Sequence, residues 1–252
     1  MTLPAALVPW LPFVVALAAL LLVQQVVIQV LFALLYRVTH HRTLSLLLYA
    51  LLVWPGTVVH ELSHWLMARF LGVYARAPYL LPSKPDEQGR MVLGHVLVER
   101  SDVVRRSLIG VAPLVAGSAA VAAVAHYAFT LPVPVLEQEG LGGLRPLLRA
   151  MPGVFAARDA WVYLYVIFAI ANAMMPSPSD REAWPTVLFF AGLVGVGLAV
   201  TIGVPQAPPE LTSFALRVAA WLTFAFVVTA VLDAALLLLL WPLERLLWSA
   251  GR

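Results

Sequence analysis

The sequence has no cysteine among its 252 residues, and charged residues make up only 12% of it. The missing cysteine excludes disulfides, thiolate zinc sites, iron–sulfur clusters and cysteine nucleophiles. The low charge excludes a water-soluble globular domain, because such domains carry about 25% charged residues. Hydrophobic residues reach 62%, which also excludes a disordered chain. The class that remains is an integral membrane protein.

Lysine is nearly absent as well, since fifteen of the sixteen basic residues are arginine, and the net charge is +3. In so apolar a chain, this charge fits loops that orient a protein in a bilayer better than a surface for nucleic acid. If residues 76–106 are cytoplasmic, the inside carries nine basic residues and the outside six. We therefore expect a multi-pass protein with this segment and both termini in the cytoplasm.

Six apolar stretches approach the length of about 20 residues that a helix needs to cross a bilayer. They cover residues 10–36, 44–73, 107–129, 160–175, 183–204 and 214–241. Pro55-Gly56 interrupts the second stretch, and the fourth ends at Pro176. We expect an all-α polytopic fold of about six transmembrane helices. Its parts would be an N-terminal flanking helix (1–43), a core (44–182) and a C-terminal two-helix region (183–252).

Two segments between these stretches are long enough to carry structure. In residues 91–99, every second position is Met91, Leu93, His95, Leu97 or Glu99, and these alternate with Val92, Val96 and Val98. A period of two residues is typical of a strand. We therefore expect a small β-hairpin or strand at the membrane surface. Residues 131–158 are rich in proline and glycine, and we expect an external loop with a surface helix.

The second apolar stretch contains His60-Glu61-Leu62-Ser63-His64, an H-E-x-x-H motif. Residues four apart share one helical face, so both imidazoles can reach one metal ion. Glu61 would lie beside that ion, where a general base can act on metal-bound water. Ionisable groups are expensive inside a bilayer, so three of them in five residues need a compensating partner. The alternative is that His60 and Glu61 pair across helices and His64 faces water.

A catalytic zinc ion commonly has three protein ligands, and without cysteine the third must be His, Asp or Glu. The remaining candidates near a membrane face are Asp102, His126, Asp159, Asp180, Glu182 and Asp233. Asp180 is favoured because it follows a short apolar helix that Pro176 and Pro178 break. Such breaks are tolerated at membrane depth only where protein or a water-filled cavity surrounds them. The alternative role for Asp180 is to cap the next helix.

These segments resemble the site-2 protease family of intramembrane zinc metalloproteases. The stretch HELSHWLMARFLGV is similar to the family's H-E-x-x-H followed by A-R-x-x-G-V, and IGVAPLVAG is similar to its A-G-P-L-A-N stretch. Asn172 and Asp180 have the separation of the first and ninth residues in the family's N-x-x-P-x-P-x-L-D-G motif. The sequence differs at Ser63 and Arg181, where the family commonly has glycine, and both prolines lie one place later.

The resemblance implies an intramembrane zinc endopeptidase that holds one Zn²⁺ ion through His60, His64 and Asp180. Glu61 would be the general base, and Asn172 would help to hold the substrate backbone. The substrate would be a membrane protein, most simply a single-span helix, in the plasma membrane of a prokaryote. No nucleic-acid partner is expected, and the oligomeric state is left open.

Two other functions stay open. The first is a zinc-binding membrane scaffold or regulator that cleaves nothing, although Glu61 beside both histidines argues against it. The second is a metal or proton transporter, which would use the intramembrane residue Asp233 and the glutamines of the first stretch.

Overall fold

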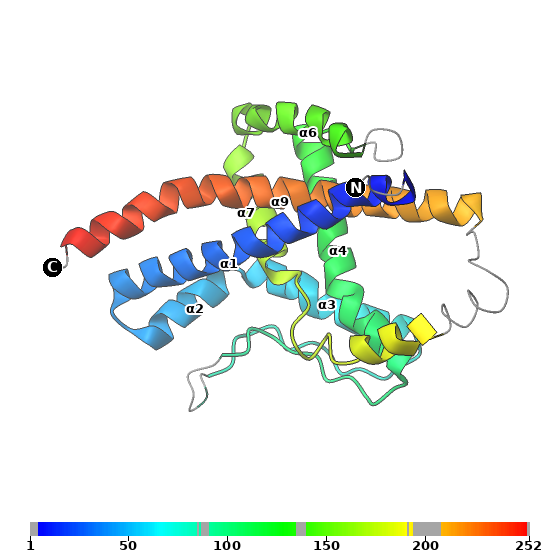
Figure 1. Ribbon diagram of the computed structural model, residues 1–252. Coiled ribbons are helices and arrows are strands. Elements are labelled where there is room, and N and C mark those ends of the chain that lie inside the picture. Colours follow the sequence, from blue (N-terminus) through cyan, green and yellow to red (C-terminus); the bar gives the residue numbers. More distant parts are fainter. Residues whose placement is uncertain are drawn as a thin grey trace.

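A computed structural model describes residues 5–84, 86, 91–134, 140–190, 192–193 and 208–250, and this part of the chain is mostly helical (Figure 1). The α-helices are α1 (Leu11–Thr39), α2 (Arg42–Leu52), α3 (Trp54–Phe70), α4 (Val103–Phe129), α6 (Arg145–Ala150), α7 (Ala160–Ala173) and α9 (Pro209–Ala250). The 3-10 helices are η1 (Ala5–Trp10), η2 (Gly140–Leu144) and η3 (Met151–Ala156). Residues 184–190 are also helical.

The long helices are those of an all-α membrane protein. Three segments are long and apolar enough to cross a bilayer: Val8–Thr39, Val103–Phe129 and Pro209–Leu246. Helices α2 and α3 together make a fourth candidate, bent by 67° at their junction. The six predicted spans are thus not found in the described residues. The fourth predicted stretch forms only the 14-residue helix α7, and most of the fifth lies outside the described residues.

The bend between α2 and α3 has a local cause in the sequence. Pro55 lies in the first turn of α3, where the missing proline N–H is tolerated because no helical carbonyl needs it. One turn further into a continuous helix the same residue would break a hydrogen bond and clash with the preceding turn. The chain therefore ends α2 at Leu52 and starts a new helix, close to the predicted interruption.

Helices α3, α4 and α7 pack against one another, and α1 lies along α9. Close approach is enabled by glycine, since a Cβ atom at Gly56 would overlap the backbone carbonyl of Ala169 in α7. The main buried cluster joins α1, α4, α7 and α9, so it draws on all three predicted parts of the chain. The 140–156 segment docks on this cluster through Leu147, Met151 and Val154.

Helices α1 and α9 run in parallel. The rings of Phe13 and Phe226 lie 5.9 Å apart, and further along both helices Arg37 Nη2 contacts Glu244 Oε1 at 2.6 Å. In Figure 1 this pair crosses α4 steeply. The α3–α4–α7 group is thus held on one side by two long helices that share a direction.

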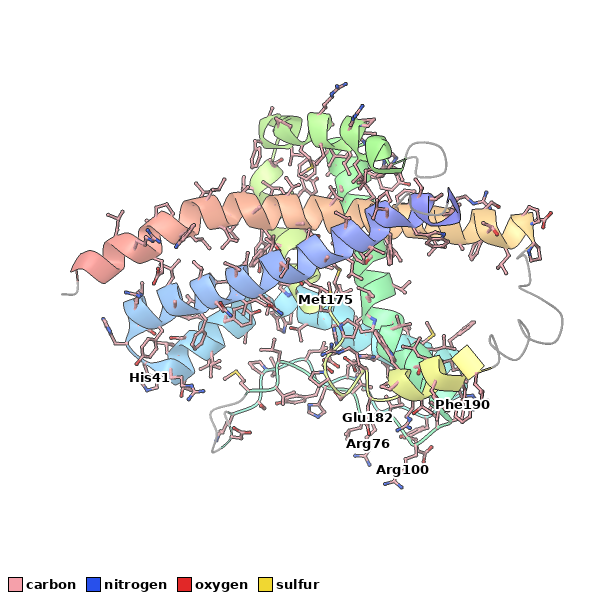
Figure 2. The ribbon with its side chains drawn as sticks, in the orientation of Figure 1. His41, Arg76, Arg100, Met175, Glu182 and Phe190 are labelled. Atoms are coloured by element: carbon pink, nitrogen blue, oxygen red, sulfur yellow. The ribbon has the colours of Figure 1, made fainter. Side chains whose placement is uncertain are left out.

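The strand expected between Met91 and Glu99 does not form in the described residues. The segment is extended and lies beside residues 74–83, but the two make only isolated antiparallel bridges. These bridges are Ala75–Val98 and Tyr79–His95. Figure 2 shows the side chains of Arg76 and Arg100 pointing away from the helices, on the outer side of this paired segment. The paired segment, residues 74–83 with 91–99, is therefore an extended cover and not a sheet.

Prolines in the first half of the paired segment explain the broken ladder. From the first bridge to the second, four residue steps on one side oppose three on the other. The same slip recurs before the hydrogen bond from Ser83 N to Val92 O. The longer side of each slip contains a proline, Pro78 or Pro82, and proline cannot donate to a ladder. The alternation in residues 91–99 indicated an extended chain, but it carried no information about the prolines opposite.

Candidate metal centre

Helix α3 carries His60 and His64 on one face, as the i, i+4 spacing predicts. Their ring centroids are 4.8 Å apart, and their Nε2 atoms approach to 3.1 Å. The side chains are only 13% and 9% exposed. The two imidazoles therefore converge on one point inside the protein.

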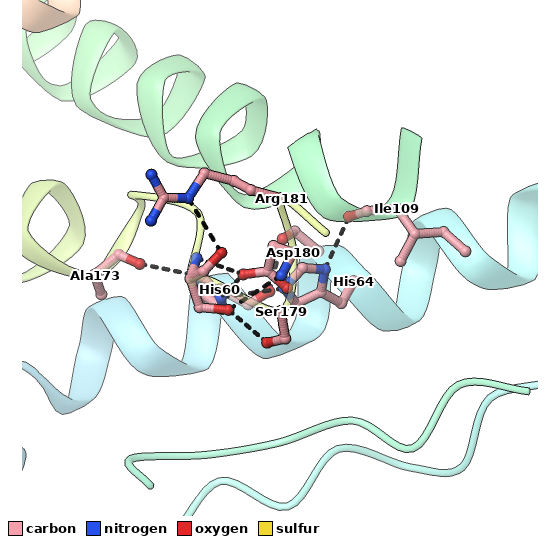
Figure 3. Close-up of polar contacts among 9 residues, drawn as sticks. His60, His64, Ile109, Ala173, Ser179, Asp180 and Arg181 are labelled. Atoms are coloured by element: carbon pink, nitrogen blue, oxygen red, sulfur yellow. Dashed lines mark hydrogen bonds and ion pairs between the residues drawn. The ribbon is translucent and has the colours of Figure 1, made fainter. Parts of the chain in front are cut away.

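Asp180, in the loop after α7, completes this group (Figure 3). Its Oδ1 lies 3.2 Å from His64 Nε2, and its Oδ2 lies 3.6 Å from His60 Nε2. One ligand atom from each of the three residues falls within 4.8 Å of the others. Within the described part of the chain, these three side chains form a group that could hold a metal ion.

Backbone carbonyls fix which nitrogen of each imidazole faces the centre. His60 Nδ1 donates to Ala173 O at 2.6 Å, and His64 Nδ1 donates to Ile109 O at 2.8 Å. With Nδ1 protonated, a neutral imidazole presents a bare lone pair at Nε2. Metal-bound histidines commonly donate their other ring N–H to a backbone carbonyl in this way.

The donor set fits a cation on chemical grounds. With both imidazoles neutral, their two Nε2 lone pairs and the carboxylate are all acceptors, and such acceptors repel unless a positive charge, either a proton or a metal ion, lies among them. Imidazole and carboxylate suit zinc and several other divalent transition metals. The residues therefore fit a metal ion, although the donor set does not by itself select zinc.

Hydrogen bonds between Ser177 and Asp180 hold the loop that carries Asp180. Ser177 N donates to Asp180 Oδ2 at 2.7 Å, and Asp180 N donates to Ser177 Oγ at 3.3 Å. The exposed Arg181 side chain turns away, with Nε donating to Ser177 O at 3.4 Å. Arg181 therefore leaves the carboxylate free to face the histidines.

Helix α4 presses directly on this loop. A Cβ atom at Gly110 would overlap the carbonyl oxygen of Asp180, so only glycine allows the present contact. Burial alone raises the pKa of Asp180. Hydrogen bonds with His60, His64 and Ser177 outweigh that effect and hold its pKa well below the usual range. Asp180 is therefore ionised at neutral pH and ready to bind a cation.

Glu61 lies beside the three residues and is buried. It shares with them a cavity of about 890 Å³ between α3, the start of α4, the Asp180 loop and the paired segment. Gly94 of the paired segment sits on Glu61, since a Cβ atom there would lie 2.9 Å from Glu61 Cγ. The wall of the cavity thus contains both Glu61 and the extended residues 91–99 of the paired segment.

Asn172, at the end of α7, lines the same cavity. Its Nδ2 donates to Phe168 O at 2.9 Å, while its buried Oδ1 has no hydrogen-bond partner among the described residues. The structure therefore places Asn172 at the cavity, where its role in substrate binding stays a prediction.

The other ligand candidates lie apart from the centre or face outward. Asp102 caps α4 by accepting from Arg105 N at 3.0 Å, and His126 Nδ1 donates to Leu131 O at 3.2 Å. Glu182 is exposed. Asp233 is 1% exposed within α9, and its carboxyl group interacts with the Asn172 side chain. Asp159 is exposed as well, and none of these five candidates belongs to the convergent group.

Sequence reasoning missed the carbonyls of Ala173 and Ile109 and the contacts of Gly94 and Gly110. The Ala173 carbonyl could have been found, because it belongs to the last turn of α7, just before Pro176, where helical carbonyls lack donors. Comparison with protein-family models, with curated proteins and with solved structures finds no match to this chain. The functional argument therefore depends on the residues and their geometry.

Proposed function

We propose that this protein is an intramembrane zinc endopeptidase that cleaves membrane-protein segments, as the resemblance to the site-2 protease family implies. The observation that carries the proposal is the convergence of His60, His64 and Asp180 in a cavity that also contains Glu61. A site that only binds a metal has no need of a second buried carboxylate at this position. The apolar helices α3 and α4, which line the cavity, support a site within reach of a bilayer.

His60, His64 and Asp180 would hold the ion. When bound, zinc would lower the pKa of a coordinated water toward about 7 and polarise the scissile carbonyl. Zinc is proposed over other divalent metals because catalytic sites with two histidines and one carboxylate are typical of zinc peptidases.

The protein's own residues would move the proton. Glu61 would take it from the attacking water and later deliver it to the leaving amine, so that one carboxylate serves as base and then as acid. Asn172, which lines the cavity, would help to hold the substrate backbone, as the resemblance implies. The paired segment covers Glu61 through Gly94 and so limits the entry of bulk water.

The substrate would have to be unwound before cleavage, because a helix hides its carbonyls in internal hydrogen bonds. We place the paired segment and the opening of the cavity on the cytoplasmic side, from the distribution of basic residues. The transporter alternative would use Asp233 and the glutamines of α1. Of these glutamines, Gln25 and Gln29 are exposed, and the buried Gln24 already has a structural use, since its Nε2 donates to Ala171 O at 2.8 Å.

The test compares purified wild-type protein with Glu61→Gln for zinc content and for cleavage of single-span peptides in vesicles. We expect one zinc ion per chain in both, with cleavage lost in the variant, because Glu61 lies outside the ligand group. His60→Ala is the matched control and should lose zinc. If zinc binds but the wild type cleaves no peptide, the scaffold function is favoured. Zinc loss in Glu61→Gln equal to that in His60→Ala would refute its role as base.

A further inference from the structure

Helix α4 has a proline in its interior, Pro113, four residues after Ile109. In an α-helix the N–H of each residue donates to the carbonyl four residues earlier. Pro113 has no N–H, and its ring crowds that same carbonyl. The carbonyl of Ile109 is therefore without its helical donor.

The carbonyl that Pro113 leaves free is the one that holds the metal centre. Ile109 O accepts from His64 Nδ1 at 2.8 Å, and the region is buried, with Ile109 at 5% exposure. A buried carbonyl without a donor is unfavourable. The His64 imidazole supplies the donor that the Ile109 carbonyl lacks, and Pro113 leaves that carbonyl free to accept it. Gly110, the next residue, contacts the Asp180 backbone. One turn of α4 thus holds two of the three residues in the centre.

We propose that Pro113 is a positioning residue of the metal centre. By withholding an N–H it reserves the Ile109 carbonyl for His64, which keeps the proton on Nδ1 and turns Nε2 toward the ion. The proposal rests on the metal centre proposed above, but it does not depend on proteolysis.

The first test substitutes Pro113→Ala, which returns an N–H donor to position 113. The matched control is Pro242→Ala, because Pro242 is also inside a helix, in α9, outside the residues that line the metal cavity. Affinity for Co²⁺ and thermal unfolding of the metal-free, full-length protein in detergent are both measured. We expect Pro113→Ala to bind Co²⁺ at least about tenfold more weakly, because loss of a hydrogen-bond partner of a metal ligand typically weakens binding by that much. We do not expect it to unfold at a lower temperature. Pro242→Ala should bind like the wild type.

A second variant separates the missing N–H from the proline ring. An alanine-like α-hydroxy acid at position 113 forms an ester, which has alanine's side chain but no N–H. We expect it to restore Co²⁺ affinity and the absorption spectrum of the wild-type complex. Equal affinity in the wild type and Pro113→Ala would overturn the proposal, and so would weak binding by a folded ester variant. A wild type that binds no Co²⁺ or Zn²⁺ would instead contradict the metal centre itself.

Discussion

At the scale of single residues, the centre is ordered by the partners behind each ligand. Each imidazole is tied through Nδ1 to a backbone carbonyl, and Asp180 is tied through Oδ2 to the Ser177 N–H. Ser63, between the two histidines in the sequence, donates its hydroxyl to His60 O at 2.6 Å and so adds no unpaired group. The ligand atoms are therefore fixed before any ion arrives, which reduces the ordering that binding would otherwise require.

Replacing Asp180 with alanine should weaken zinc binding strongly. The variant removes one of three convergent donors, so the loss should exceed the roughly 10–100-fold that outer partners contribute, and peptide cleavage should stop. Competition with a chromophoric chelator measures the affinity. Glu182→Ala is the matched control, because this exposed carboxylate is two residues away and should bind zinc normally. Normal zinc binding by Asp180→Ala would remove Asp180 from the ligand set.

Acidification should weaken zinc binding through the imidazoles and not through Asp180. The pKa of Asp180 is depressed, so the stabilisation from its ionised form is present above the ordinary value of about 3.9 and is lost only as the pH falls toward the folded-state pKa. Histidines must be neutral to bind metal. Wild-type affinity for zinc should therefore fall between about pH 7.5 and 5.5, while infrared difference spectra of the metal-free protein show no protonated-carboxyl band from Asp180. A carboxyl band in that range that is present in the wild type and missing in Asp180→Asn would show that Asp180 takes up a proton there.

At the scale of elements, three segments meet at the centre because small residues allow close contact. Gly56 brings α3 against α7, and Gly110 brings α4 against the Asp180 loop. The paired segment packs on Thr57 and Glu61 of α3 through Gly94. Side chains at these positions would separate the elements that carry the ligands.

Gly110→Ala should therefore damage the site more than the fold. Its Cβ would overlap the Asp180 carbonyl, and overpacking of this kind costs about 1–3 kcal/mol unless the loop moves away. We expect lower zinc affinity with a small drop in unfolding temperature, measured on the same samples. Gly153→Ala is the control, because a Cβ atom there meets nothing within 4 Å. Wild-type zinc affinity in Gly110→Ala would contradict the close contact.

Sequence reasoning predicted the elements that local chemistry determines. The H-E-x-x-H spacing placed His60 and His64 on one face, and the proline break indicated that Asp180 could reach them. It did not predict the paired segment correctly, because Pro78 and Pro82 act on a partner segment that periodicity in residues 91–99 does not describe. The hydrogen bond of His64 joins residues 45 apart, and such long-range contacts require the packing of α3 against α4.

At the scale of the whole molecule, the long helices must be strongly tilted or extend beyond the hydrocarbon. Helix α9 has 42 residues, or roughly 60 Å at 1.5 Å per residue, against a hydrocarbon thickness of about 30 Å. Such a helix can tilt to fit the bilayer. The steep crossing of α4 by α1 and α9 in Figure 1 fits helices that are tilted to different degrees.

The parallel course of α1 and α9 predicts their topology. If each crosses the bilayer once, the start of α1 and the end of α9 lie on opposite sides, unlike the expectation that both termini are cytoplasmic. Cysteines at Thr43, after α1, and Ser249, near the end of α9, should react with an impermeant reagent from the same side of sealed vesicles. A cysteine at Ser213, near the start of α9, should react from the other side. Labelling of all three from one side would contradict this topology.

The central claim is that a metal ion at His60, His64 and Asp180 supports peptide hydrolysis inside the membrane. The most direct test measures cleavage of a single-span peptide by purified protein, stripped of metal with a chelator and then supplied with Zn²⁺, with fragments identified by mass spectrometry. We predict no cleavage by the stripped protein, recovery with about one Zn²⁺ per chain, and a cut within or next to the apolar segment. Cleavage by the stripped protein at the wild-type rate, or none at full zinc occupancy with any peptide of a broad panel, would contradict the account.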